Sequence, residues 1–322
     1  MKLGVFTVLL AQKPLEEAMD YIAAKGLDAV EIGTGGYPGH AHCPLDELLE
    51  DRAKLDAYRK VFESRGLEVS ALSCHGNPLH PQKHIAQGYH DAFMKTLELA
   101  SRMGVKTVVG FSGCPGDSDD AKYPNWPVAP WPNEYQELLA WQWEQKVIPY
   151  WREVARRADE LNVNIALELH GGFSVHSPGT LLRLREAAGE RIGANLDPSH
   201  MWWQGIDPVQ AVHILGRNNA IHHFHAKDTA IDPVNVNRHG VTDMQPYTQM
   251  LDRAWQFRTV GYGHDLKTWA DILSALRLVG YDGVISIEHE DGLMSADEGF
   301  TKAVNNLKQL LMREPIGEMW WV

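Results

Sequence analysis

The chain has 322 residues, of which 44% are hydrophobic, and it carries a formal net charge of −12 with a pI near 5.7. This acidic balance argues against a nucleic-acid groove and against binding to an anionic membrane surface, because contacts with phosphate depend on Lys and Arg. No segment approaches the roughly 18 uninterrupted apolar residues of a membrane span. We therefore expect a soluble protein that acts on a small neutral molecule.

The first residues and the cysteines bear on localisation. The opening MKLGVFTVLLAQK resembles a weak signal peptide, but it leads into a helix start at Pro14 without a small-residue cleavage site, so we interpret it as a first strand. The cysteines are odd in number and show no C-x-x-C spacing; they are Cys43, Cys74 and Cys114. They indicate a reducing compartment, and we expect a cytoplasmic protein.

Short runs rich in Val and Ile alternate with amphipathic stretches along the whole chain. The predicted strands cover residues 3–9, 29–33, 68–72, 107–111, 163–169, 192–196, 220–225 and 284–288. The predicted helices cover residues 15–25, 45–65, 84–103, 135–161, 179–188, 209–215, 267–279 and 296–312. Eight strand-helix units in strict alternation predict parallel strands, and thus an α/β fold with a single (β/α)8 TIM-barrel domain over residues 1–322.

Two predicted connections are much longer than the others. Residues 114–133 (CPGDSDDAKYPNWPVAPWPN) follow the fourth strand, and residues 230–265 follow the seventh strand. Because both follow strands, both should lie over the C-terminal face, where barrel enzymes carry their active sites. We expect lids or subunit contacts, and surface decoration is the alternative.

Four consecutive predicted strands end in acidic residues and histidines, in LELH, LDPSH, HFHAKD and IEHED. Because the carboxyl ends of parallel strands meet at one rim, these side chains should converge. Three carboxylates and one imidazole suit Mn²⁺ first, with Mg²⁺, Co²⁺ or Zn²⁺ as alternatives. The expected ligands are Glu168, Asp197, His225 and Glu288. A loop salt bridge is the alternative for any one of them, and His222 and His289 fall off the inward phase and are expected to pack or face solvent.

These motifs resemble those of the xylose isomerase-like sugar isomerase and epimerase superfamily, which shares its barrel with the apurinic endonucleases. The resemblance covers essentially the whole barrel, and the four motifs stand where epimerase members carry Glu, Asp-x-x-His, His-x-His and Glu. It implies that the four expected ligands hold the metal. It also implies that Glu168 and Glu288 act as acid/base groups and that His200 contacts a substrate oxygen.

Other polar residues around the same rim are expected to contact substrate. They are His75, with Asn77, in SCHGNPLHP, His170, Lys227, and Arg258 and His264 in WQFRTVGYGHD, which resembles the Gly-x-Gly-His segment of these families. Trp202 and Trp203 should wall the pocket or an interface, with helix packing as the alternative. The sequence departs from ketose 3-epimerases where Ala226-Lys227-Asp228 replaces the Gly-Glu that follows His-x-His.

The resemblance implies proton abstraction next to a sugar carbonyl through a metal-stabilised enediolate. We expect an isomerase or epimerase. The main alternative is a lyase that eliminates a group β to the carbonyl, as in inosose dehydratases and enzymes that cleave 3-keto glycosides. A non-catalytic sugar-binding barrel and an apurinic endonuclease are further alternatives.

The expected partners are a small-molecule carbohydrate, without nucleic acid or membrane, and further copies of the same chain in a homo-oligomer, with a small partner subunit as another possibility. The C-terminal EMWWV is apolar. We expect it to be covered by its own barrel or by a neighbouring subunit.

Overall fold

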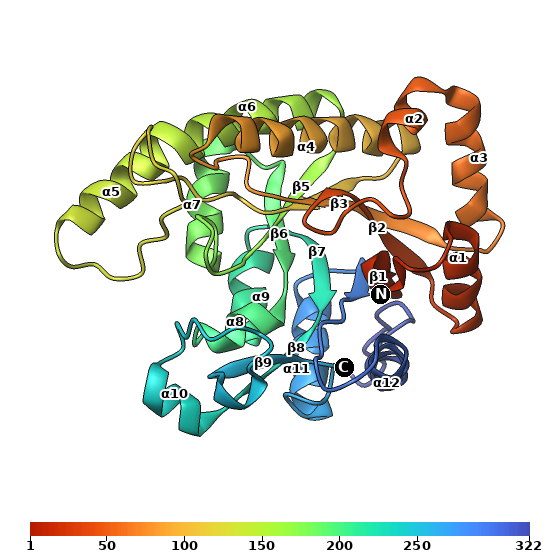
Figure 1. The fold of residues 1–322 in the computed structure, drawn as a ribbon. Coiled ribbons are helices and arrows are strands. Elements are labelled where there is room, and N and C mark those ends of the chain that lie inside the picture. Colours follow the sequence, from red (N-terminus) through yellow and green to blue (C-terminus); the bar gives the residue numbers. More distant parts are fainter.

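Eight parallel strands close into a barrel in the computed structural model, which describes residues 1–322 (Figure 1). The order around the barrel is β1-β10-β7-β6-β5-β4-β3-β2. These strands are β1 (Lys2–Phe6), β2 (Ala29–Gly36), β3 (Glu68–His75), β4 (Thr107–Gly110), β5 (Asn164–Glu168), β6 (Ile192–Leu196), β7 (Ile221–Ala226) and β10 (Val284–Ile287). Each of the eight predicted strands overlaps one of them, and the predicted (β/α)8 barrel is confirmed.

The α-helices lie outside the barrel, and the longer ones cover the outer faces of the strands (Figure 1). They are α1 (Leu15–Ala24), α2 (Leu45–Glu50), α3 (Arg52–Glu63), α4 (Lys83–Met103), α5 (Glu134–Gln142), α6 (Ile148–Glu160), α7 (Pro178–Ala188), α8 (Pro198–Trp203), α9 (Pro208–Gly216), α10 (Pro233–His239), α11 (Leu266–Leu278) and α12 (Ala296–Leu310). The helix predicted over 45–65 is interrupted at Asp51, because this side chain accepts hydrogen bonds from the backbone N–H groups of Ala53 and Lys54 and so begins α3.

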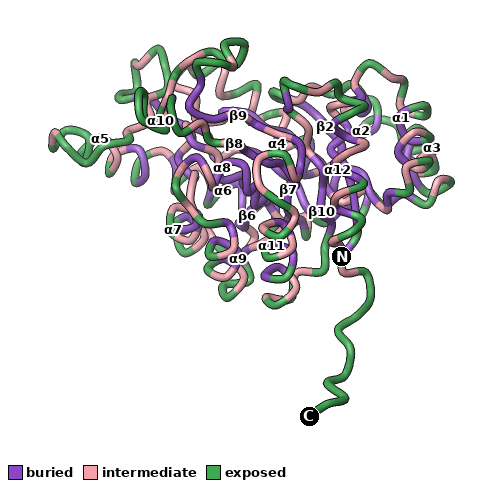
Figure 2. Tube along the Cα trace, turned by 90° about the horizontal axis from the view of Figure 1, so that it is seen from below, coloured by how far each residue is buried: buried purple, intermediate pink, exposed green.

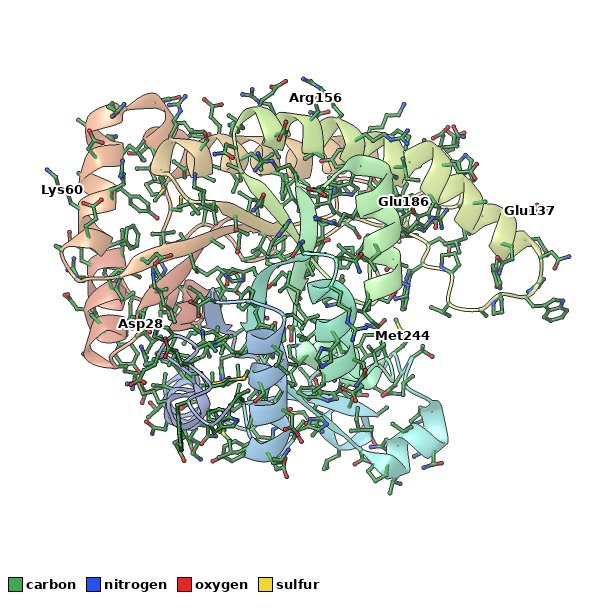
Figure 3. The ribbon with its side chains drawn as sticks, turned by 180° about the vertical axis from the view of Figure 1, so that it is seen from behind. Asp28, Lys60, Glu137, Arg156, Glu186 and Met244 are labelled. Carbon is green, nitrogen blue, oxygen red and sulfur yellow. The ribbon has the colours of Figure 1, made fainter.

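Burial follows the layers of the barrel. The strands are largely buried and the outer helix faces are exposed (Figure 2), because the helices cover the sheet from outside. Charged side chains such as Lys60, Arg156 and Glu186 project outward from α3, α6 and α7 (Figure 3). The three cysteines are buried and unpaired. None of the helices has the length and apolarity that a membrane crossing requires.

The two long connections differ in structure. Residues 114–133 have little regular structure before α5 begins. The connection after β7 folds on itself, because β8 (Asp228–Ile231) pairs antiparallel with β9 (Trp255–Arg258) and α10 lies between them. Residues from both connections line one cavity together with His170, which lies just beyond the end of β5. Whether they act as lids or subunit contacts stays a prediction.

The C-terminal segment extends away from the rest of the molecule (Figure 2). Arg277 donates hydrogen bonds to the carbonyl oxygens of Met312 and Glu314, and Arg313 pairs with Asp28, so the chain is held in place as far as Glu314. Trp320 and Trp321 are 86% and 68% exposed. The expectation that the barrel itself covers EMWWV is therefore wrong, while cover by a neighbouring subunit stays a prediction.

Candidate metal centre and active site

The structure brings the four expected metal ligands together at the carboxyl ends of the strands. Glu168 is the last residue of β5, Asp197 follows β6 and caps α8, His225 lies near the end of β7, and Glu288 follows β10. One donor atom from each residue lies within 4.8 Å of the donor atoms of the other three. Sequence positions up to 120 residues apart thus meet because parallel strands of one barrel end at one rim.

The donor set fits a divalent cation. Oδ2 of Asp197 and Nδ1 of His225 are buried and accept or donate no hydrogen bond. Nδ1 of His225 lies 3.1 Å from an oxygen of Glu288 and 3.4 Å from an oxygen of Glu168. Buried carboxylates so close together are costly without a positive charge between them. Three oxygen donors and one nitrogen donor could therefore hold a metal ion here.

Lys227 supplies part of the positive charge. Its Nζ lies 2.7 Å from an oxygen of Glu288, 2.9 Å from Glu290 and 3.2 Å from Asp197. Burial would lower the pKa of Lys227, but these carboxylates outweigh burial and raise that pKa well above its usual range. Burial raises the pKa of Asp197 to about 7, against the attraction of Lys227. The pKa of Asp197 therefore stands well above its usual range.

Glu31 is a member of the site that the sequence did not single out. It lies in β2 and is fully buried, and both of its carboxylate oxygens lie 3.0 Å from Nε2 of His225. It also accepts hydrogen bonds from the hydroxyls of Ser73 and Ser286. Burial opposes its charge, but His225 and His223 outweigh burial and hold the pKa of Glu31 at about 2. The carboxylate thus fixes the His225 ring with Nδ1 toward the other ligands.

Three predicted substrate contacts surround Glu168. Nε2 of His75 lies 2.9 Å from one carboxylate oxygen, Nε2 of His200 lies 3.0 Å from the other, and the His170 ring stands 4.0 Å from the His200 ring. Burial, together with the charges of His170 and Lys227, lowers the pKa of His200 to about 3, so its ring is neutral. Nδ1 of His75 is buried and has no hydrogen-bond partner.

Arg258 and His264 do not join this group. Nε of Arg258 donates to Asp291, while Nδ1 of His264 lies 2.9 Å from Asp228 and its ring stacks on Trp202 at 3.9 Å. Neither lines the cavity over Glu168. The carboxylates that engage them are themselves buried, so both side chains are committed to holding the connection after β7.

Asp228, which ends the HFHAKD motif, has a structural role that the sequence did not predict. Its carboxylate accepts backbone hydrogen bonds from Gly261, Gly263 and His264, at 3.0, 3.1 and 3.0 Å, and another from the indole N–H of Trp269. A Cβ at Gly263 would lie 2.4 Å from the carbonyl oxygen of Thr229, so only glycine fits there. Asp228 therefore ties the end of this connection to its beginning.

A small cavity opens above the cluster. It has a volume of about 200 Å³ and is lined by Glu168, Glu288, Lys227, His75 and His170, with Glu290 and the rings of Phe6, Tyr37 and Phe111 among the other walls. Such a mixture of aromatic walls and convergent polar groups is typical of a small-molecule site. Of the two tryptophans of α8, Trp203 lines the neighbouring larger cavity and Trp202 packs on His264 and Trp269.

A family model for the xylose isomerase-like TIM barrel matches residues 19–310. The chain belongs to this family. The uncharacterized protein YfiH of Bacillus subtilis (strain 168) is 39% identical over 314 residues, which are 97% of this chain and 99% of that protein. The expected membership of the superfamily is confirmed. The barrel is of an enzyme-like type, and its buried cluster could bind a metal.

Several solved structures share this fold at low sequence identity. A D-tagatose 3-epimerase-like protein superposes with a TM-score of 0.64 at 20% identity, covering 96% of this chain and 98% of that one. The probable 3-DHS dehydratase AsbF of Bacillus anthracis gives 0.65 at 15% identity, with coverage of 96% and 99%. The IolI protein with a zinc atom gives 0.62 at 20% identity, with coverage of 96% and 98%. At these identities they show the fold and leave the reaction open.

Proposed function

We propose that this protein is a divalent-metal-dependent isomerase or epimerase that removes a proton from the carbon next to the carbonyl of a sugar. The observation that carries this proposal is the position of two carboxylates, Glu168 and Glu288, in one buried cluster with Asp197 and His225. A bound cation, Mn²⁺ by preference for this oxygen-rich set, would polarise the carbonyl and stabilise the enediolate. Mg²⁺, Co²⁺ and Zn²⁺ are the alternatives.

The side chains of the cavity divide the remaining work. Glu168 and Glu288 reach the cavity from strands that are separated by β6 and β7, so one can take a proton that the other returns on the opposite face. Burial opposes the charge of Glu168, but contacts with His200, His225 and His75 lower its pKa well below the usual range and keep it ionised. Lys227, His75, His170 and His200 bind and orient the sugar oxygens.

A lyase is the second candidate, and a specific feature favours it. The small cavity adjoins a second cavity of about 700 Å³. A free hexose bound in the small cavity would leave this second cavity unused, whereas a sugar that carries a leaving group could extend into it. In this reaction Glu168 takes the proton, a C=C bond forms, and the C–O bond to a group β to the carbonyl breaks as the leaving oxygen gains a proton. The dehydratase name of the relative AsbF supports this class of chemistry.

The two candidates are separated by NMR in D₂O on the Mn²⁺-loaded protein with methyl 3-keto-β-D-glucopyranoside. Deuterium at a carbon next to the ketone without free methanol supports the isomerase or epimerase, and release of methanol supports the lyase. Glu168→Gln should abolish either signal, while Glu186→Gln, an exposed change on α7, should leave it intact. If the native protein gives no deuterium incorporation and no methanol release, the proposal is overturned for this substrate class.

Action in the cytoplasm is part of the same proposal. Three buried, unpaired cysteines support a reducing compartment. The net charge of −12 speaks against the apurinic-endonuclease alternative. A purely sugar-binding barrel would have no need for two carboxylates that flank a metal position.

A further inference from the structure

A second cavity of about 700 Å³ lies directly beside the small cavity over Glu168, and His170 lines both. Its outer walls come from the two long connections. Trp126 and Val128 follow β4, and residues 241–247 with Arg253 and Trp255 follow β7. Met244, labelled in Figure 3, belongs to this outer wall and is 92% exposed. The cavity therefore borders the proposed reaction site at His170 on one side and opens to solvent on the other.

Aromatic rings form the inner walls of this cavity. Trp203 and Trp255 stack face to face, with centroids 4.8 Å apart, and Tyr247 contributes another ring. A Cβ at Gly171 would lie 2.2 Å from the Trp203 ring and 3.4 Å from the Trp126 ring. The glycine directly after His170 thus allows two indoles to approach the end of β5. The aromatic surface begins where the small cavity ends.

The two charged side chains of this lining, Asp243 and Arg253, already have partners. Asp243 accepts hydrogen bonds from the backbone N–H groups of Gln245 and Ala254. Arg253 donates to the carbonyl oxygens of Gln245 and Trp255, and its guanidinium lies over the Tyr247 ring at 4.2 Å. Much of the remaining wall is apolar, from Trp126, Val128, Val241, Met244 and Trp255, and a second sugar would bury hydroxyls against it without hydrogen-bond partners, which is unfavourable. A flat apolar group would instead gain burial and stacking.

We propose that the larger cavity binds an aromatic group attached to the sugar, so that the substrate is an aryl-substituted sugar. The sugar lies over Glu168 and Glu288, and the aryl group lies beyond His170 between Trp126, Tyr247 and Trp203. This inference rests on the proposed function, because it assumes a sugar in the small cavity. The inference applies both to the isomerase or epimerase reaction, in which the abstracted proton is returned, and to the lyase reaction, in which a group is eliminated.

Calorimetric titration of the Mn²⁺-loaded protein with unreactive glucosides tests the inference by binding alone. Phenyl β-D-glucopyranoside should bind about tenfold more tightly than methyl β-D-glucopyranoside, because only the phenyl ring reaches the second cavity. Cellobiose, which carries a second sugar in place of the ring, should show no such gain. Equal affinities for the phenyl and methyl glucosides, or tighter binding of cellobiose than of the phenyl glucoside, would overturn the inference.

Paired variants locate the gain. Val128→Glu places a charge on the cavity wall at a side chain that is 59% exposed, and it should reduce the phenyl-to-methyl ratio to about one. Val234→Glu on α10, 74% exposed and outside the lining, should preserve the tenfold ratio. Trp126→Ala should also reduce the ratio, with Trp131→Ala, at an indole that is 76% exposed and outside the lining, as its control. If the phenyl-to-methyl affinity ratio stays at tenfold in both Val128→Glu and Trp126→Ala, the aryl group binds elsewhere and the inference is refuted.

Failure of the proposed sugar chemistry would look different. In that case neither glucoside binds, while phenol alone still binds the native protein and no longer binds Val128→Glu. Such a result would support an aryl site and reject the sugar. If methyl glucoside binds and the phenyl ring adds no affinity, the sugar site is supported and the aryl site is rejected.

Discussion

Both carboxylate oxygens of Glu31 lie 3.0 Å from Nε2 of His225, while Nδ1 of the same ring faces Glu168 and Glu288. One ring nitrogen of the imidazole thus contacts a buried carboxylate, and the other is directed at the proposed metal position. This arrangement sets the tautomer and the orientation of His225.

Glu31→Gln should weaken Mn²⁺ binding about 10- to 100-fold, because the neutral amide orients the imidazole less firmly. The affinity is measured by competition with a fluorescent chelator, and circular dichroism checks the fold. Glu47→Gln, an exposed change on α2, serves as the control. An unchanged affinity in Glu31→Gln would show that this contact does not tune His225.

Lys227→Met should destabilise the metal-free protein by about 3–5 kcal/mol, because Asp197 and Glu288 lose a buried counter-charge. Saturating Mn²⁺ should restore most of this loss, since the cation neutralises the same carboxylates. The measurement is urea unfolding with EDTA and with Mn²⁺, and Lys267→Met, at a side chain that is 75% exposed, is the control. A loss of equal size in both conditions would indicate that Lys227 and the metal act on different groups.

His222, on the outer side of the barrel, should make the free energy of unfolding depend on pH. Burial lowers its pKa to about 4 in the folded protein, against an ordinary value near 6.5. As the pH falls from 6.5 to 4, the unfolded chain gains a proton here that the folded chain does not, so stability is lost in this window. His222→Gln should remove about 1–3 kcal/mol of that loss.

Urea unfolding of the native protein and of His222→Gln at pH 7.5 and pH 4.5 measures the difference. His84→Gln, where the side chain is exposed on α4, should follow the native pH dependence. Parallel pH profiles for the native protein and His222→Gln would contradict the assignment.

We propose that a second copy of the chain covers the exposed C-terminal segment, because Trp320, Trp321 and Val322 have no cover within their own chain. Truncation after Arg313 keeps the pair between Arg313 and Asp28, so the barrel should stay folded. Light scattering should then show a smaller particle than the full chain forms. An oligomer of unchanged size, or a monomeric full chain, would rule out this contact. A small partner subunit stays a prediction.

The elements of the barrel could be predicted because their signals are local. Apolar runs and glycines mark the strands and helix ends, and the acidic residues at four strand ends identify the rim. Glu31 was missed because its partner His225 lies 194 positions away, on a strand that meets it only across the barrel. A lone carboxylate in the apolar run AVEIGT was the available signal, since a buried charge needs a partner.

The connection after β7 shows where local patterns end. DTAI and WQFR are four-residue strands, too short for a periodic signal, and their pairing joins positions 24 to 30 residues apart. The motif around Arg258 and His264 suggested contact with substrate. The partners that hold these two side chains, Asp291 and Asp228, are distant in sequence and visible only in the fold.

The clamp at Asp228 has an evolutionary consequence. Asp228 ties Gly261, Gly263 and His264 back to the end of β7. The segment between Asp228 and Gly261 therefore leaves the barrel and returns to it at nearly the same point. Mutations, insertions or even exchange of that excursion can then accumulate without moving Asp197, His225 or Glu288. A lineage built on this barrel could acquire new substrates by inheriting the clustered carboxylates unchanged and changing only the sequence of the aromatic connection between β8 and β9.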